Sequence, residues 1–147
     1  MYLTDSSGRF AWATRTVLAH TNQRIEAKDV NGGHTGYCLD YSSKLRKCAG
    51  GNDYEFNIYT DGTIRSAKSG YCLYAPRAEN EWSIHFGPCN PLDKLYLWEF
   101  PFTGKIKNRA ANMCLDNRGQ KLQNGNQIQV YECFDVWSEN WWIGGIP

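Results

Sequence analysis

The dipeptide Cys-Leu occurs three times along the chain, each time inside the same frame of apolar residues. The three copies are "GYCLD" at 36–40, "GYCLY" at 70–74 and "NMCLD" at 112–116. An aliphatic residue stands eight positions before each cysteine, and these residues are Val30, Ile64 and Ile106. Chance seldom repeats a motif together with its offset, so we interpret the chain as three structural repeats.

Aromatic residues extend this frame, because Phe56 stands eight positions before Ile64 and Trp98 eight positions before Ile106. Each unit then reads as a strand, a cysteine, a loop, a second cysteine and an aromatic strand, followed by a glycine turn and a short strand. The third unit ends without its last strand, and "RIEAKDV" at 24–30 supplies the matching piece. An N-terminal strand that completes the last unit predicts a closed barrel with roughly threefold symmetry, which leaves no open sheet edge.

The composition also favours an all-β protein of one domain. The 147 residues include 6 Trp, 9 Tyr, 6 Phe and 14 Gly, and runs at helical spacing are absent. The formal charge is +1 with the signs interspersed, so we expect no nucleic-acid partner. No apolar run approaches about 18 residues, so membrane insertion is not expected either.

An even number of cysteines in a small chain favours disulfide bonds and an oxidising compartment. Zinc is the alternative, but its ligands usually stand two to four residues apart, and no two cysteines here are that close. No metal site or cofactor is therefore predicted, and a secreted protein is expected. The N-terminus lacks the apolar core of a signal peptide, so a signal would have been removed or the chain is an excised piece. The repeat frame predicts one local bond in each unit: Cys38–Cys48, Cys72–Cys89 and Cys114–Cys133.

The third unit carries the strongest candidate site. "NG" at 124–125 predicts a two-residue hairpin turn between strands at 119–123 and 126–133. Strand alternation places Gln129 and Tyr131 on one face, and a strand running antiparallel beside the disulfide would place Asp116 near Tyr131 with Gln129 one step further.

A carboxylate, an amide and an aromatic ring on one face suit a sugar. Asp116 would accept hydrogen bonds from two neighbouring hydroxyl groups, and Gln129 can both donate and accept. The ring of Tyr131 would cover the apolar face of a pyranose. Alternatively, Asp116 caps the turn at 116–119 and Tyr131 belongs to the core. We favour the binding site for the three residues as a set.

The other two units serve as internal controls. In the second unit Tyr74 replaces the acid, His85 the amide and Gly87 the aromatic residue, so a site of this kind is lost there. The first unit keeps Asp40, but only nine residues separate its two cysteines, and a lysine and an arginine replace the amide and the aromatic residue. Asp40 is therefore a secondary candidate, with a structural turn preferred.

The repeat resembles the ricin B-type lectin family. The resemblance rests on "CLD" at 38–40 and 114–116, "NGNQIQVYEC" at 124–133 and "DGTIRS" at 61–66, and it covers about 24–147. It implies a β-trefoil of three disulfide-containing repeats. One departure is clear, because the family's Gln-x-Trp motif has lost its glutamine in every unit, as in "YEF", "YLW" and "ENW" or "NWW".

The resemblance also implies roles for individual residues. At the matching positions Asp116 binds sugar hydroxyls, Gln129 supports it and Tyr131 stacks on the ring. The asparagine before the Gln-x-Trp motif also contacts sugar in the family, and Asn140 is the best match by its distance from the second cysteine. Galactose and N-acetylgalactosamine are the ligands that the resemblance suggests.

The predicted organisation is an N-terminal extension or linker at 1–20 and a lectin domain at 21–147, with repeats at about 24–66, 67–108 and 109–147. No nucleophile–histidine–acid signature is found, so we expect non-catalytic carbohydrate binding rather than an enzyme. Such a chain would serve as the cell- or substrate-targeting part of a toxin or a secreted enzyme, with a partner chain or domain. The alternative is a trefoil with decayed sugar sites that acts as a protein-interaction subunit.

Overall fold

The computed structural model describes residues 2–4, 10–12, 18–101 and 104–144. Within these ranges the regular structure consists of strands and of single 3-10 turns. The strands are β1 (Tyr2–Thr4), β2 (Phe10–Trp12), β3 (Leu18–Lys28), β4 (His34–Leu39), β5 (Lys44–Lys47), β6 (Phe56–Tyr59), β7 (Ile64–Ser66), β8 (Cys72–Tyr74), β9 (Trp82–Ser83), β10 (His85–Gly87), β11 (Trp98–Glu99), β12 (Lys107–Asn108), β13 (Met113–Asn117), β14 (Asn126–Glu132) and β15 (Trp141–Gly144). The 3-10 turns are η1 (Asn52–Tyr54), η2 (Lys94–Tyr96), η3 (Arg118–Gln120) and η4 (Trp137–Glu139). No helix in the described ranges is long and apolar enough to cross a membrane.

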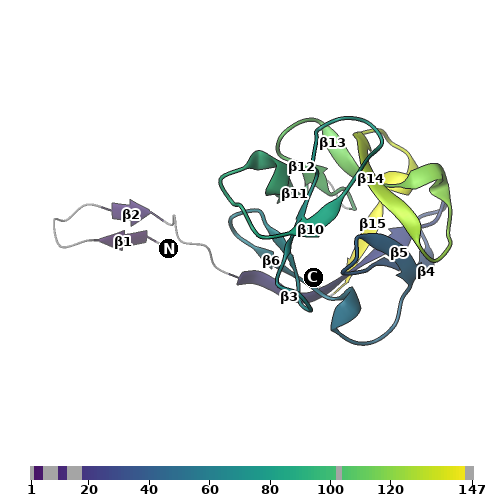
Figure 1. Ribbon diagram of the computed structural model, residues 1–147, viewed down its shortest axis with the longest axis horizontal. Helices are drawn as coiled ribbons and strands as arrows, with labels where there is room; N and C mark the ends of the chain where they lie inside the picture. The colour runs from purple at the N-terminus through teal and green to yellow at the C-terminus, as the bar shows by residue number, and fades with distance from the viewer. Residues whose placement is uncertain (1, 5–9, 13–17, 102–103, 145–147) are drawn as a thin grey trace.

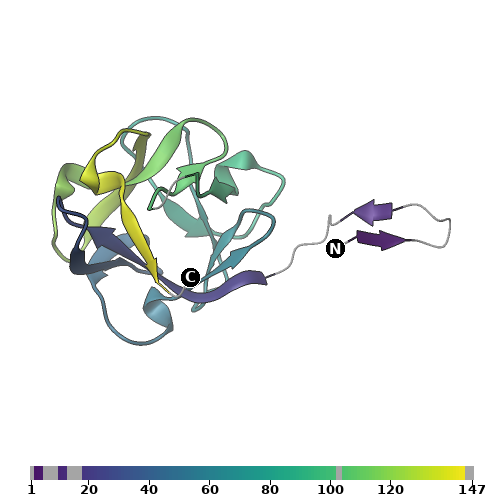
Figure 2. The same ribbon diagram turned by 180° about the vertical axis from the view of Figure 1, so that it is seen from behind.

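Thirteen strands form one antiparallel hydrogen-bonded sheet that curves round a common core (Figures 1 and 2). The first strand of this sheet in the chain pairs with the last, because β15 lies beside β3 from Trp141 opposite Ala27 to Gly144 opposite Arg24. Figure 1 shows it as the purple β3 beside the yellow β15. The prediction that an N-terminal strand completes the third unit is confirmed, and the strand order is the one expected for a β-trefoil.

The three units bury equivalent residues in one core. Phe56 opposes Ser66, Trp98 opposes Asn108 and Trp141 opposes Ala27 in three matching hairpin pairs. The aromatic member of each pair is at most 1% exposed. Two residues before Ser66, Asn108 and Ala27 stand the isoleucines Ile64, Ile106 and Ile25, and each is 0% exposed.

The place predicted for Val30 is therefore taken by Ile25. Val30 is 69% exposed in the loop between β3 and β4. In this loop the Asp29 carboxylate accepts hydrogen bonds from the backbone N–H groups of Asn31 and Gly33. Ile25 stands thirteen residues before Cys38 rather than eight, because the first unit holds five extra residues here. The offset of eight residues holds in the second and third units. In the first unit it points to Val30, which lies on the surface.

Each unit is closed by its own disulfide bond. The bonds predicted from the repeat are confirmed, with Cα–Cα distances of 5.0 Å for Cys38–Cys48, 4.9 Å for Cys72–Cys89 and 5.0 Å for Cys114–Cys133. In two units a buried indole adds a second link across the unit. Trp98 Nε1 donates to the carbonyl oxygen of Leu73 at 2.9 Å, and Trp141 Nε1 donates to that of Leu115 at 3.0 Å.

The connection between β13 and β14 differs from the predicted two-residue hairpin. Asn124 and Gly125 do form a turn, in which Asn126 N–H donates to the Gln123 carbonyl at 3.2 Å. Only Gly125 of the pair has a positive φ, of 84°. The strand predicted at 119–123 is replaced by η3 and an irregular segment. The loop is held from within by two buried asparagines, because Asn126 Nδ2 donates to Asn117 Oδ1 at 2.6 Å.

The predicted N-terminal extension, 1–20, lies largely outside the described residues. Within it, β1 and β2 pair in a separate two-stranded sheet. β3 begins at Leu18, inside the range expected for the extension, because Leu18 and His20 pair with Tyr59 and Ile58 of β6.

The exchange of Val30 for Ile25 in the core can be tested by a matched pair of substitutions. Ile25→Ala should lower the free energy of unfolding by about 2–5 kcal/mol, because it leaves a cavity in a fully buried site. Val30→Ala should change it by less than about 0.5 kcal/mol, because the side chain is solvated. Chemical denaturation of the oxidised protein measures both, and equal losses would contradict the assignment.

Candidate functional site

The register of β13 against β14 decides which residues of the third unit meet. Asp116 lies opposite Gln129, and Cys114 lies opposite Tyr131. Asp116 was predicted to lie near Tyr131 with Gln129 one step further, and this order is wrong, because Gln129 is the direct neighbour and Tyr131 lies one step further. The reason is that the bonded cysteines are not opposite each other, since Cys133 N–H donates to the carbonyl of Asn112 at 3.2 Å. The disulfide therefore joins two residues that lie diagonally across the strand pair. As a result Gln129, and not Tyr131, lies opposite Asp116.

The Asp116 carboxylate is held at both oxygens. Gln129 Nε2 donates to Oδ2 at 2.7 Å, and Ser138 Oγ donates to Oδ1 at 2.7 Å. Asp116 and Ser138 are 6% exposed and Gln129 is 4% exposed. Burial raises the pKa of Asp116 above its ordinary value, although the hydrogen bonds from Ser138 and Gln129 oppose this shift. The carboxylate is thus fixed in direction and partly desolvated.

Ser138 occupies the place that the sequence assigned to Asn140. Two adjacent tryptophans made that assignment ambiguous, and burial settles it, because Trp141 is 1% exposed and Trp142 is 37% exposed. With Trp141 as the core aromatic residue, the motif reads Glu139-Asn140-Trp141 and Ser138 precedes it. The backbone carbonyl of Asn140 accepts from Lys28 N–H at 3.1 Å. Asn140 lines a neighbouring hollow of about 660 Å³ that does not include Asp116.

Two aromatic rings of the third unit lie close to each other. Tyr131 is half-buried on β14, and its ring centroid lies 6.1 Å from that of Phe134 at an interplanar angle of 44°. Phe134 is 48% exposed and was not singled out from the sequence, although it directly follows the second cysteine. The buried Oε1 atom of Gln129 has no hydrogen-bond partner among the described residues. An unsatisfied buried acceptor is costly, so it favours a donor from a ligand or from water.

Glu139 stands where the family motif has glutamine and is 1% exposed. Its Oε1 accepts from Phe134 N–H at 2.7 Å and lies 3.8 Å from Lys105 Nζ. Its Oε2 atom is buried and has no hydrogen-bond partner in the described part of the chain. Burial raises the pKa of Glu139 to about 7, and the nearby Asp116 charge adds to the shift.

One cluster of metal-type donors exists among the residues that the structure describes. Donor atoms of Glu26, Cys38 and Cys48 lie within 4.8 Å of one another. The two sulfur atoms are joined in a disulfide and are not thiolates. The Glu26 carboxylate already accepts from Gly36 N–H at 2.9 Å and contacts His34 Nδ1 at 3.2 Å. The cluster therefore lacks the donor set of a metal site.

The sequence matches the family model of the ricin-type beta-trefoil lectin domain over residues 26–142. The chain belongs to this family. This match confirms the resemblance to the ricin B-type lectins and the β-trefoil fold that the resemblance implied. A comparison with curated protein sequences gives no significant match.

Solved structures show the same fold at low sequence identity. A non-toxic homologue of type II RIPs from Momordica charantia (bitter gourd), in complex with α-methyl-D-galactoside, is 20% identical with a TM-score of 0.68; the match covers 84% of this chain and 48% of that one. The C-half of the earthworm R-type lectin, in complex with GalNAc, is 16% identical with a TM-score of 0.66, over 83% of this chain and 97% of that one. The designed threefold-symmetric protein ThreeFoil is 15% identical with a TM-score of 0.71, over 84% and 98%. This lectin domain therefore spans about half the length of the bitter gourd protein.

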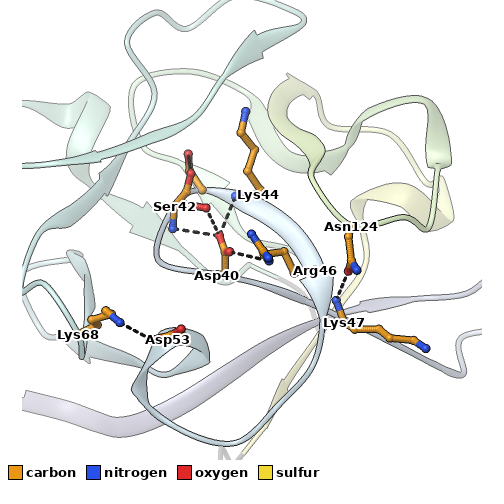
Figure 3. Close-up of polar contacts among 9 residues, drawn as sticks. Asp40, Ser42, Lys44, Arg46, Lys47, Asp53, Lys68 and Asn124 are labelled. Atoms are coloured by element: carbon orange, nitrogen blue, oxygen red, sulfur yellow. Dashed lines mark hydrogen bonds and ion pairs between the residues drawn. The ribbon is translucent and has the colours of Figure 1, made fainter.

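The first unit of the lectin domain uses its aspartate inside a turn (Figure 3). Asp40 is 3% exposed, and its Oδ1 accepts from Ser42 N–H, Ser42 Oγ and Lys44 N–H. Its Oδ2 lies 3.6 Å from Arg46 Nε. Lys44 and Arg46 occupy the register positions of Gln129 and Tyr131, because Arg46 lies opposite Cys38. The contacts of Asp40 are those of the structural turn that the sequence favoured.

The second unit fills the equivalent place with rings. Tyr74 lies opposite His85 and Cys72 lies opposite Gly87, as the count from the second cysteine predicted. The Tyr74 ring stacks on Tyr96 with centroids 4.5 Å apart. A Cβ atom added at Gly87 would lie 3.0 Å from Tyr74 Cε1, so Tyr74 covers this glycine. The unit contains no carboxylate at the position of Asp116.

The buried Glu139 should make stability depend on pH. Its folded pKa of about 7 exceeds its ordinary value, so the folded state favours the protonated form. The unfolding free energy should fall as pH rises from about 4.5 to about 7, because the unfolded chain releases this proton in that interval while the folded state retains it. Glu139→Gln should therefore raise the melting temperature more at pH 8 than at pH 4.

The matched control for this pH dependence is Glu81→Gln, because Glu81 is an exposed acid and is not among the charges that shift the pKa of Glu139. It should leave the pH dependence of the melting temperature unchanged. A Glu139→Gln protein that melts with the wild-type pH profile would show that Glu139 is not the titrating group.

Proposed function

We propose that this lectin domain binds carbohydrate non-catalytically through its third unit, with Asp116 as the central acceptor. The observation that carries the proposal is the two-sided support of its carboxylate by Gln129 and Ser138. Each carboxylate oxygen has about two acceptor directions, so each can accept a further hydrogen bond from a sugar hydroxyl. Support from both sides fixes these directions before a ligand arrives and lowers the ordering cost of binding.

The neighbours of the carboxylate complete the chemistry of a sugar site. The unpartnered Oε1 of Gln129 can accept from a hydroxyl group that lies next to one bound by Asp116. The half-buried ring of Tyr131 and the exposed ring of Phe134 offer apolar surface for the C–H face of a pyranose. We keep Asn140, which the sequence assigned as a sugar contact, as a peripheral contact from the neighbouring hollow. Ser138 takes a supporting role beside Gln129, because it donates to the Asp116 carboxylate.

Galactose and N-acetylgalactosamine are the first ligands to test. The similar bitter gourd protein was solved with a methyl galactoside and the earthworm lectin with GalNAc. In the first unit the equivalent carboxylate is held by its own turn, and in the second unit the equivalent residue is Tyr74. We therefore assign binding to the third unit alone and keep Asp40 as a turn residue.

One shallow site binds weakly, and firm attachment generally requires several linked sites. We therefore propose that the domain acts as the targeting part of a larger secreted assembly, such as a toxin or a secreted enzyme, with a partner chain or domain. Three disulfide bonds support an oxidising compartment. If the domain binds no glycan, the alternative of a protein-interaction subunit takes its place.

The central prediction compares two aspartates at equivalent positions. Asp116→Asn should weaken binding of a galactose or N-acetylgalactosamine glycan at least about tenfold, because a charge-assisted acceptor is lost. Asp40→Asn should leave binding unchanged, because the side-chain contacts of Asp40 with other described residues are with its own turn and with Arg46. A broad glycan array followed by calorimetric titration measures both. Binding that survives in Asp116→Asn and is lost in Asp40→Asn would place the site in the first unit.

Binding should also weaken in acid. The raised pKa of Asp116 means that its carboxylate takes up a proton at a higher pH than an exposed aspartate does. Affinity should therefore fall as pH decreases through that raised pKa, while circular dichroism shows that the fold is retained. An affinity that stays constant down to the ordinary pKa of an aspartate would contradict an acceptor role for the buried carboxylate.

A further inference from the structure

A second cavity lies where the three hairpin pairs of the trefoil meet, away from Asp116. It measures about 730 Å³, and each unit contributes to its lining: Tyr59 and Gly62 from the first, Glu99 and Gly104 from the second, and Trp141 and Trp142 from the third. The lining includes neither Asp116 nor Gln129 nor Tyr131. Its size lies in the range of small-molecule sites, about 300–1,000 Å³.

Two cations line this cavity at equivalent places in the repeat. Asn108 lies opposite the core residue Trp98, and Ala27 lies opposite the core residue Trp141. Arg109 directly follows Asn108, and Lys28 directly follows Ala27. Their backbone N–H groups make matching bonds, to the carbonyl of Leu97 at 2.8 Å and to that of Asn140 at 3.1 Å. The same position in the remaining hairpin pair is Ala67, whose N–H donates to the Glu55 carbonyl at 2.9 Å.

Each cation lies over a glycine turn of the neighbouring hairpin. A Cβ atom at Gly62 would lie 2.9 Å from Arg109 Cζ, and one at Gly104 would lie 3.0 Å from Lys28 Nζ. Both glycines have positive φ, of 97° and 88°. A side chain at Gly62 or Gly104 would collide with the cation, so the two glycines make room for Arg109 and Lys28.

Neither cation has a carboxylate partner among the described residues, whereas nearby cations do. Lys107 Nζ lies 3.0 Å from Glu99, and Lys105 Nζ lies 3.8 Å from Glu139. The first of these pairs is important, because it neutralises the one carboxylate that lines the cavity. Among the residues that the structure describes, the cavity thus presents two positive charges that no carboxylate pairs with.

Apolar rings border the same space. Lys28 Nζ lies 4.4 Å from the centroid of the Trp142 ring, which fixes the ammonium group by a cation–π contact. Phe100 lines the cavity and is 39% exposed, so its ring is available to a ligand. Charge and exposed rings together select a ligand that is anionic at one end and apolar over one face.

From these observations we propose that the cavity between the three hairpin pairs is a second binding site, specific for a carboxylate-bearing pyranose such as a uronic acid. Arg109 and Lys28 bind the carboxylate, and Phe100 covers the apolar face of the ring. This site is separate from the Asp116 site and does not depend on it. The two sites together would let one chain engage a glycan that carries both neutral and acidic sugars.

The test compares two sugars that differ only in the carboxylate. Methyl β-D-glucuronide and methyl β-D-glucoside are titrated into the protein by NMR, with the indole N–H signal of Trp142 as the reporter. The glucuronide should shift this signal and bind more weakly at high salt, and the glucoside should bind at least about tenfold more weakly. Equal binding of the two sugars, or binding of neither, would overturn the proposal.

Variants then assign the charge. Arg109→Gln should weaken glucuronide binding about tenfold, and Lys28→Gln should do the same, because each removes one cation from the cavity. Lys121→Gln is the matched control, because this lysine is exposed and does not line the cavity. Asp116→Asn should leave glucuronide binding unchanged, which separates this site from the one in the third unit. Wild-type affinity in both Arg109→Gln and Lys28→Gln would contradict the assignment.

Discussion

In two of the three units, a buried indole N–H holds the hairpin pair against the strand that carries Cys-Leu. Trp141 donates to the carbonyl of Leu115, and Asp116 is the next residue along that strand. Ser138 stands three residues before Trp141 in the same unit. This hydrogen bond and the disulfide across the unit fix the relative position of two segments, one with Ser138 and one with Asp116. Ser138 and the Asp116 carboxylate can therefore form their hydrogen bond. The geometry of the candidate site therefore follows from the packing of the core.

The same scaffold supports three different surfaces because the strand register is constant while the side chains at equivalent positions differ. In every unit the residue two positions before the second cysteine lies opposite the first cysteine, whether it is Arg46, Gly87 or Tyr131. What differs is the residue after Cys-Leu, which is an aspartate bound by its own turn, a stacked tyrosine, or a carboxylate supported from two sides. The repeat preserves a position for binding, and only the third unit places a supported carboxylate there.

The repeat and its three disulfide bonds could be predicted from the sequence because both are local patterns. The offset that chose Val30 failed, since five extra loop residues move the core position to Ile25 without changing the motif. Register could not be predicted either, because a disulfide can join diagonal as well as opposite residues, and so Asp116 was expected beside Tyr131. Ser138 was missed because two adjacent tryptophans fit the motif equally well, and only burial distinguishes them.

The most direct measurement of the central claim is an NMR titration of the isotope-labelled domain with N-acetylgalactosamine. The side-chain amide of Gln129 is the reporter, because its nitrogen donates to Asp116 and its oxygen has no hydrogen-bond partner among the described residues. This amide and the backbone of β13 and β14 should show the largest shifts, while the signals of the backbone around Asp40 and Tyr74 should stay unchanged. Shifts confined to the first or second unit, or none at millimolar sugar, would contradict it.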